Sequence, residues 1–285
     1  MPQVDGALPD FYRRMSEQIV EVERLGFDHA WVTEHHFGGY GGTLPHPPTF
    51  LSAVAQVTSR IRLGVAVAVL PLHRPIDVAE QYAMADVISG GRIDFGIGKG
   101  SEPVEYRKFG ASQDEATQRF HESAEIIRQA WSDQPVNFRG EFYHYENVNI
   151  LPKPVQRPHP PIWVGATRNE DTFRWAGEQG YDLMTIPFVH PSTDALRELV
   201  KIYRDALARS GHDFVGRQVL GKFHIYVSDS FERGMREAAP FMKNYSDIHH
   251  QVDPTRKLTE RDIGSDMARG FIIVGDPERC GDTIQ

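Results

Sequence analysis

Short apolar segments alternate with amphipathic helical patterns along most of this 285-residue chain. This alternation limits the possible fold more than any other feature. Residues 10–25 carry apolar side chains at steps of three and four and are followed by Gly26, which predicts a helix with a glycine cap. An apolar strand at residues 30–34 follows almost at once. Because the strands are apolar along their whole length, both faces of their sheet must be covered, as in a parallel α/β fold.

The same helix and strand patterns recur later in the chain. Further helices are predicted at residues 48–57, 76–87, 172–178 and 194–210. Further strands are predicted at residues 63–70, 93–98, 161–167, 182–187, 219–227 and 270–274. We therefore predict an α/β fold of the TIM (β/α)8 type that forms a single domain over residues 1–285.

Three stretches depart from this rhythm. Residues 136–148 alternate in polarity around Arg139 and Gly140, which predicts a small hairpin inserted into the barrel. Residues 152–161 contain five prolines and are expected to form a stiff connector. Residues 244–270 are polar and weakly periodic, which is typical of a functional loop or of disorder; we predict a mobile lid.

The two ends of the chain do not complete such a barrel. Residues 1–8 are too polar and too rich in proline and glycine to form the strand that should precede the first helix. The last predicted helix begins near Asp276 and reaches Gln285 after about two turns. We expect a barrel that lacks its first strand and its C-terminal end.

Composition excludes several classes of function. The net charge of −8 disfavours nucleic-acid binding, because phosphate contacts need a basic face. The single cysteine, Cys280, excludes an internal disulfide and suits a reducing compartment. No apolar run approaches the roughly 20 residues that span a bilayer, and no signal-peptide core is present. These features predict a cytoplasmic protein that works without a membrane.

The predicted strand at residues 30–34 opens into the sequence Glu34-His35-His36-Phe37, followed by glycines. This sequence resembles the signature of the bacterial luciferase-like, flavin-dependent monooxygenases. Other segments resemble that family in the same order: residues 63–71, 73–75, 91–100, 109–110 with Arg119 and Glu122, 152–156, 161–167, 172–180 and 274–278. The resemblance covers residues 9–285. It implies a TIM barrel that uses reduced FMN and molecular oxygen to oxidise an organic substrate.

His35 is the predicted catalytic residue. Adjacent residues at a strand end point to opposite sides, so His35 and His36 are not expected to share a metal ion, and we predict no metal site. One of the two histidines could simply fill polar space under the barrel rim. The resemblance implies that His35 faces the flavin and supports its oxygen chemistry, with Glu34 among the cofactor-binding residues. An imidazole that titrates near neutrality suits such proton management.

The resemblance also implies two cations near the FMN phosphate. Lys99 lies between Gly98 and Gly100 after an apolar strand, where a barrel-top cation can meet a phosphate. The family usually has arginine at this position, so bidentate binding is weakened here. Arg119 matches the second family cation. Both could instead be ordinary solvated charges.

Hydroxyl groups at the start of the helix near residue 172 suggest a further phosphate contact. Thr167 ends a predicted strand and Thr172 begins the next helix, whose free N–H groups can bind an anion. Plain helix capping by Asn169 or its neighbours would need no ligand. Glu170 and Asp171 would repel a phosphate if they pointed inward.

The resemblance implies the remaining cofactor contacts. Ala66 and Val67 match the position of a non-proline cis peptide beneath the flavin ring. Gly165 and Ala166 are the other implied cofactor-binding residues. Gly98 stands where the family sometimes has a cysteine, which excludes thiol chemistry there. The predicted substrate contacts are the aromatic residues Phe37, Tyr106 and Phe188, with Tyr40 beside them, although aromatic residues are also common core fillers.

The leading hypothesis is a two-component FMN-dependent monooxygenase. It would be a homodimer that receives reduced FMN from a separate flavin reductase and oxidises a small, apolar organic substrate. One alternative is an oxidoreductase that uses the deazaflavin cofactor F420 on the same barrel. Another is a non-catalytic flavin-binding or partner subunit. The resemblance does not identify the substrate.

Overall fold

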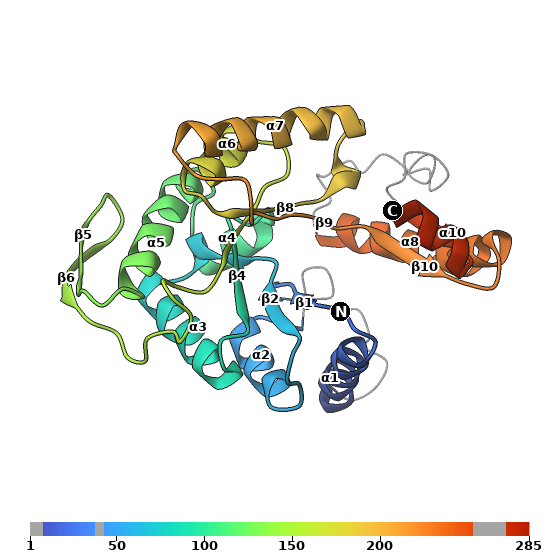
Figure 1. The fold of residues 1–285 in the computed structure, drawn as a ribbon, viewed down its shortest axis with the longest axis horizontal. Helices are drawn as coiled ribbons and strands as arrows, with labels where there is room; N and C mark the ends of the chain where they lie inside the picture. The colour runs from blue at the N-terminus through green and yellow to red at the C-terminus, as the bar shows by residue number, and fades with distance from the viewer. Residues whose placement is uncertain (1–7, 38–42, 253–271, 285) are drawn as a thin grey trace. The chain divides into compact units, whose positions relative to one another are not determined.

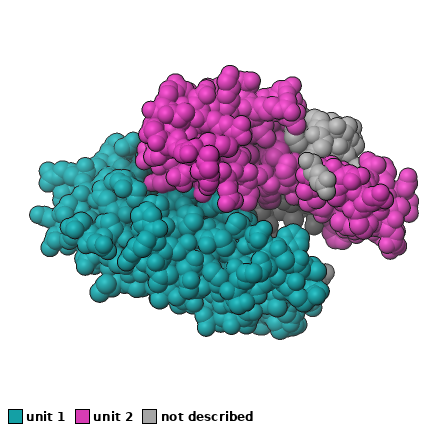
Figure 2. All heavy atoms as spheres, viewed as in Figure 1, with its two compact units in different colours: residues 1–165 teal, residues 166–285 magenta. Residues whose placement is uncertain are grey.

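The computed structural model describes residues 8–37, 43–252 and 272–284. The chain divides into two compact units, Met1–Gly165 and Ala166–Gln285, which Figure 2 shows in different colours. We describe each unit by itself. The prediction of a single domain stays a prediction.

Unit 1 is built on parallel strands, as the apolar segments predict. Strands β1 (His29–Val32), β2 (Arg62–Val65), β4 (Ile93–Gly98) and β7 (Ile162–Gly165) lie next to one another in that order. Strand β3 (Ala68–Val69) also pairs with β4. Every residue of β4 is buried, as expected for a strand that is covered on both faces.

The described part of unit 1 also contains helices. They are α1 (Leu8–Arg24), α2 (Pro47–Ala55), α3 (Pro75–Ser89), α4 (Pro103–Phe109) and α5 (Ala116–Ala130), with a 3₁₀ turn, η2, at Leu70–Leu72. Helices α2, α3 and α5 lie side by side in chain order (Figure 1). Helix α3 ends at Ser89 and is capped by Gly90, whose φ of 68° is left-handed, so a residue without a Cβ suits this position.

The predicted hairpin is confirmed. Strands β5 (Val136–Arg139) and β6 (His144–Val148) pair in antiparallel orientation. The Glu122 carboxylate of α5 accepts hydrogen bonds from the backbone N–H groups of residues 141–143 at the hairpin turn. These bonds hold the pKa of Glu122 below its usual range although burial opposes them. Glu122 is therefore an anchor for the hairpin.

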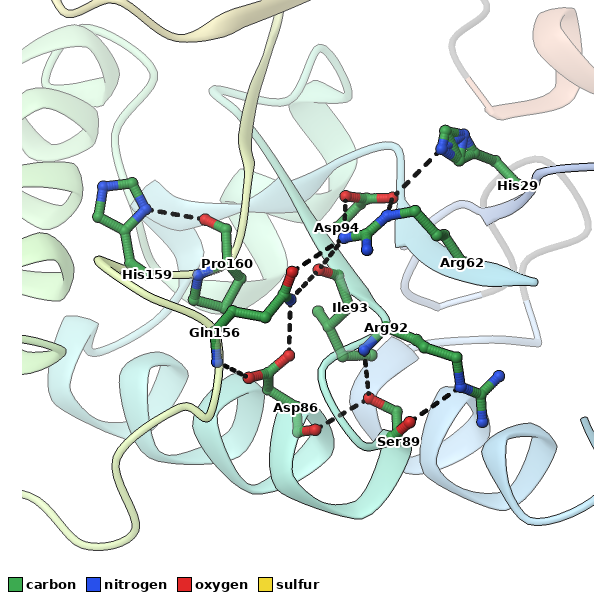
Figure 3. A network of polar contacts seen from close by, with 10 residues as sticks. All are labelled: His29, Arg62, Asp86, Ser89, Arg92, Ile93, Asp94, Gln156, His159 and Pro160. Carbon is green, nitrogen blue, oxygen red and sulfur yellow. Dashed lines mark hydrogen bonds and ion pairs between the residues drawn. The ribbon is translucent and has the colours of Figure 1, made fainter. Parts of the chain in front are cut away.

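A network of buried polar groups fixes the proline-rich connector (Figure 3). The fully buried Asp86 carboxylate of α3 accepts the backbone N–H groups of Val155 and Gln156 and the Gln156 side-chain amide. Arg62 of β2 donates to both oxygens of Asp94 on β4, at 2.9 and 2.7 Å, and to Gln156. The connector is thus tied to α3, β2 and β4 through paired groups, which buried carboxylates require.

Unit 2 contains α6 (Glu170–Glu178), β8 (Asp182–Thr185), η3 (Pro187–Val189), α7 (Thr193–Arg209), β9 (Val219–Gly221), β10 (His224–Val227), α8 (Phe231–Val252), β11 (Ile272–Gly275) and α10 (Pro277–Ile284). Strand β8 pairs with β9 and β10 with β11, both in parallel. Helices α6 and α7 pack so closely that a Cβ on Gly177 would lie only 2.4 Å from the Tyr203 carbonyl oxygen.

Several predicted elements differ in the structure. The predicted strand at 63–70 is divided into β2 and β3, and that at 219–227 into β9 and β10. Residues 244–252 belong to α8 rather than to a loop. The rest of the predicted lid, residues 253–270, lies outside the described residues. Helices α4, α5 and α8 have no counterpart among the predicted helix ranges.

The parallel α/β arrangement agrees with the predicted fold class, but the strands described within each unit form open sheets rather than a closed barrel. No described helix combines the length and apolar character needed to cross a membrane.

Candidate active site

The segment Glu34-His35-His36-Phe37 begins two residues after β1 ends. Strand β1 pairs with β2, and the N–H of Ala66 donates to the Val32 carbonyl over 2.7 Å. The bond between Ala66 and Val67 is cis, as the resemblance implies. The carboxyl ends of two neighbouring strands therefore bring the histidine segment and the cis peptide to the same edge of the sheet.

Glu34 is the centre of a buried hydrogen-bond network. Its side chain is 3% exposed, and Oε1 lies 3.1 Å from His36 Nε2 and 2.7 Å from His73 Nε2. Burial alone would raise the pKa of Glu34, but the bonds from the two imidazoles outweigh it, so the pKa lies below its ordinary value. Since an ionised carboxylate only accepts, both Nε2 atoms carry a hydrogen toward it.

These three residues also form a donor set that could hold a metal ion. Their ligand atoms all lie within 4.8 Å of one another. However, the two distances to Glu34 Oε1 are those of hydrogen bonds. The network is complete without an ion, and a metal would have to displace both Nε2 hydrogens. The prediction of no metal site stays a prediction.

His35 lies on the other side of the segment, as neighbouring residues at a strand end should. Its Nδ1 atom lies 3.3 Å from Glu105 Oε1 on α4, and a quarter of its side chain is exposed. The same Oε1 atom accepts the backbone N–H of His36 over 2.8 Å. Buried carboxylates thus hold both histidines, Glu105 on one side and Glu34 on the other.

The cis peptide fits closely between two glycines. A Cβ on Gly98 would lie 2.4 Å from Val67 Cγ2, and a Cβ on Gly165 would lie 2.7 Å from Val67 Cγ1. Real Cβ atoms do not approach other atoms so closely, so β4 and β7 need glycine at both positions. The absence of the family cysteine at Gly98 therefore has a steric reason in this chain.

Lys99 directly follows β4. Its Nζ atom lies 3.3 Å from Thr117 Oγ1 on α5. Burial lowers the pKa of His121, and the charge of Lys99 lowers it further, so His121 also lies near Lys99. Thr117 and His121 are four residues apart and share one face of α5. An ammonium, a hydroxyl and an imidazole gathered at a strand end can bind a phosphate.

Arg119 faces a different part of unit 1. Arg119 lies two residues after Thr117, so its side chain leaves α5 about 200° around the helix from that of Thr117. Its Nε donates to Glu115 over 2.8 Å, and its guanidinium carbon lies 4.1 Å from the Phe142 ring centroid. In the structure the Arg119 side chain thus contacts the hairpin and does not share a site with Lys99. To bind the phosphate, Arg119 would have to leave Glu115 and Phe142.

The predicted cofactor-binding residues of unit 2 lie near the start of α6 in the chain. The N–H of Ala166 donates to the Met184 carbonyl over 2.9 Å. Thr167 is exposed and Thr172 is buried. Asn169 caps α6, because its Oδ1 accepts the Asp171 N–H over 2.8 Å.

The acidic residues at this helix start share one ion-pair partner. Arg174 forms ion pairs with both Glu170 and Asp171. Their charge is therefore partly compensated on the helix surface, which removes much of the repulsion that we expected toward an anion.

The predicted substrate contacts differ in exposure. Phe37 is 53% exposed, whereas Tyr106 is 2% exposed and donates its hydroxyl to the Lys99 carbonyl. Phe188 is buried in unit 2 and stacks on His224 at a centroid distance of 4.9 Å. Tyr106 thus supports the backbone of Lys99, and the roles of all three in substrate binding stay predictions. Tyr40 lies outside the described residues.

The structure adds His73, Glu105 and Thr117 to the residues that the sequence indicated. His73 follows an apolar segment, as His35 does, so the same strand-end reasoning could have found it. Glu105 carried no comparable signal, because it lies on a helix that the sequence pattern did not predict. Thr117 could be found only from the face of α5 that meets Lys99.

Comparisons with known proteins agree with this geometry. A model of the luciferase-like monooxygenase family matches residues 3–285. The oxygenase component of a flavin-dependent trigonelline monooxygenase from Acinetobacter baylyi is 30% identical over 223 residues, covering 78% of this chain and 61% of that protein.

Solved structures share the fold. A monooxygenase from Streptomyces bottropensis superposes with a TM-score of 0.87 at 27% identity, covering 96% of this chain and 82% of its own. An F420-dependent secondary alcohol dehydrogenase superposes with a TM-score of 0.80 at 18% identity, covering 96% of this chain and 84% of its own. With the family model matching nearly every residue, the chain belongs to the luciferase-like monooxygenase family and is an oxidoreductase.

Proposed function

We propose that this protein is the oxygenase component of a two-component FMN-dependent monooxygenase. In this proposal a separate flavin reductase supplies reduced FMN, and the protein uses it with molecular oxygen to oxidise a small, apolar organic compound. Family membership and the relative named as an oxygenase component support this reading. A homodimer remains part of the proposal.

One observation carries the proposal most directly. The histidine segment after β1 and the cis peptide after β2 lie at one edge of the sheet, joined by the hydrogen bond from Ala66 to Val32. In this architecture the carboxyl ends of the strands supply the catalytic side chains. Val67 packs tightly between Gly98 and Gly165, so its side chain offers a fixed apolar surface against which a flat ring can pack.

The residues of unit 1 also fit a phosphate. Lys99 supplies a charge, Thr117 a hydroxyl and His121 an imidazole at the end of β4. A single ammonium binds phosphate as a point charge rather than through a planar fork. The predicted roles of Thr167 and Thr172, which belong to unit 2, stay predictions.

FMN, when bound and reduced, would supply the electrons that activate oxygen. His35 would then hold or transfer a proton beside the reacting atoms, as a partly exposed imidazole at a strand end can. Exclusion of water by the surrounding apolar side chains would suppress wasteful release of hydrogen peroxide. Glu34 and His36 would hold the segment in place from the buried side.

An F420-dependent reaction is the second candidate. It is favoured by the fold shared with the F420-dependent alcohol dehydrogenase, although that likeness concerns the fold alone. A non-catalytic flavin-binding subunit is the third. The paired histidines and carboxylates argue against it, because a protein that only binds flavin does not need them.

A single set of measurements separates these candidates. The protein is titrated anaerobically with reduced FMN and with reduced F420, and oxygen uptake is then recorded with a panel of small ketones, aldehydes and aromatic compounds. The proposal predicts tight binding of reduced FMN and oxygen uptake that one substrate class stimulates. Binding and oxidation of reduced F420 alone would support the second candidate. Binding of FMN without any oxygen chemistry would support the third.

A further inference from the structure

Three residues of helix α4 contact the histidine segment. The Phe109 ring meets the His36 ring edge-on at a centroid distance of 4.8 Å. Lys108 Nζ lies 4.9 Å from the centroid of the Phe37 ring. Glu105 contacts both histidines through one carboxylate oxygen. The helix therefore fixes the segment along its length rather than at one point.

The hydrogen bond from His36 decides the role of the Glu105 oxygen. Oε1 accepts the backbone N–H of His36 over 2.8 Å, and as an oxygen of an ionised carboxylate it can only accept. His35 Nδ1 lies 3.3 Å from the same atom. Favourable contact therefore requires that Nδ1 of His35 carry a hydrogen.

The main chain around His35 is held on both sides. Its own N–H donates to the Leu44 carbonyl over 3.4 Å, and the next N–H is bonded to Glu105. Phe37 then adopts a left-handed conformation with φ 56°, which is uncommon for a residue with a Cβ. The contacts of its ring with Lys108 and Phe109 stabilise this turn. The imidazole of His35 thus has a fixed base from which to meet Glu105.

We propose that Glu105 is a positioning residue that keeps neutral His35 in the tautomer with hydrogen on Nδ1, so that Nε2 carries the lone pair. Free histidine prefers the opposite tautomer, with hydrogen on Nε2. A buried carboxylate reverses this preference and orients the ring, as carboxylates do for many functional histidines. The chemical consequence, that Nε2 is the atom of His35 that accepts a proton, rests on the proposed function.

A purely structural role for Glu105 makes different predictions. If the carboxylate only anchored the His36 N–H, then Glu105→Gln would preserve that bond through its amide oxygen and leave His35 unchanged. If the charge positions His35, the neutral amide should hold Nδ1–H much less strongly, because charge-assisted hydrogen bonds are about twice as strong as neutral ones. The His35 tautomer is therefore the property to measure.

The test uses full-length, flavin-free protein labelled with ¹⁵N-histidine at a pH where the imidazoles are neutral. The chain has 13 histidines, so the His35 signals are assigned by their loss in His35→Gln. We expect hydrogen on Nδ1 in the wild type and in Glu105→Asp, and a shift toward hydrogen on Nε2 in Glu105→Gln. Glu125→Gln, which removes a surface carboxylate that binds Arg128, is the matched control and should leave the spectrum unchanged.

The wild-type spectrum is decisive even if Glu105→Gln fails to fold. Hydrogen on Nε2 of His35 in the wild type would overturn the inference, and so would an unchanged tautomer in folded Glu105→Gln. Activity is measured separately as substrate oxidised per reduced FMN, and Glu105→Gln should lose at least about tenfold. If His35 carries its hydrogen on Nδ1 but the protein shows no oxygen chemistry, only the proposed function is contradicted. If the protein shows oxygen chemistry but His35 carries its hydrogen on Nε2, only the positioning role of Glu105 is contradicted.

Discussion

The Nε2 atom of His73 lies 2.7 Å from Glu34 Oε1, across 39 residues of sequence. This contact completes a buried network in which one carboxylate oxygen accepts from two imidazoles. It ties the loop after β1 to the turn that precedes α3. The network therefore supports both the fold of unit 1 and the placement of the histidine segment.

This network should make stability depend on pH. The pKa of Glu34 is lowered on folding, so its stabilisation is present above its ordinary value of 4.5 and is lost as the pH falls through the lower folded value. At pH 7 we expect Glu34→Gln to lose about 2 kcal/mol of unfolding free energy. Urea unfolding of both proteins between pH 7 and pH 3 measures the difference. A difference that stays constant as the pH falls would contradict the lowered pKa.

The sequence predicted the repeating architecture well because the strands of unit 1 are mostly apolar, and the charges of Arg62 on β2 and Asp94 on β4 pair with each other. The strand predicted at residues 93–98 matches β4, and the hairpin at residues 136–148 is present. The split of residues 63–70 into two strands could not be predicted from hydrophobicity, because the apolar run in the sequence is continuous.

The candidate site was only partly predictable. Glu34 and His35 lie close to the end of a strand, and the resemblance to the family singled them out. Glu105 lies 70 residues from His35, and only the tertiary packing of α4 brings them together. For Arg119 the sequence shows that a cation is present, but it does not show on which face of α5 the side chain lies. Its predicted phosphate role therefore could not be checked from the sequence.

Removal of Lys99 should affect FMN and riboflavin differently. Lys99→Ala should weaken FMN binding by about tenfold or more, since a charged hydrogen bond to phosphate contributes about 1.5–3 kcal/mol. Riboflavin lacks the phosphate and should bind almost as before. Fluorescence titration measures both affinities, and Lys201→Ala on α7 serves as a control that should change neither. Equal weakening of both flavins would remove Lys99 from the phosphate site.

Loss of the Asp86 carboxylate should destabilise unit 1. Asp86→Ala leaves the backbone N–H groups of Val155 and Gln156 without their buried acceptor. We expect a loss of about 3 kcal/mol of unfolding free energy, measured by urea denaturation followed by circular dichroism. The matched variant Asp28→Ala removes an exposed carboxylate, with a side chain 88% exposed, and should change stability by less than about 0.5 kcal/mol. Similar losses in both variants would show that the network in Figure 3 does not anchor the connector.

The donor set of Glu34, His36 and His73 should work as a hydrogen-bond network rather than as a metal centre. Both imidazoles donate to the carboxylate, so a cation must displace two hydrogens before it can bind. We expect dialysis against EDTA to leave oxygen uptake unchanged. Titration with Co²⁺ should give no absorption bands of a tetrahedral site. Strong bands at one equivalent of Co²⁺, lost in His73→Ala, would show that the three residues do bind metal.

The release of hydrogen peroxide tests the central claim most directly. Protein loaded anaerobically with reduced FMN is mixed with oxygenated buffer, and peroxide is followed in time for the wild type, His35→Ala and His36→Ala. We predict slow release from the wild type and release at least about 10²-fold faster from His35→Ala, which should keep its fold and most of its flavin affinity. His36→Ala should be milder, because its ring points to Glu34 on the buried side. If the wild type releases peroxide as fast as free reduced FMN does, the monooxygenase account is contradicted.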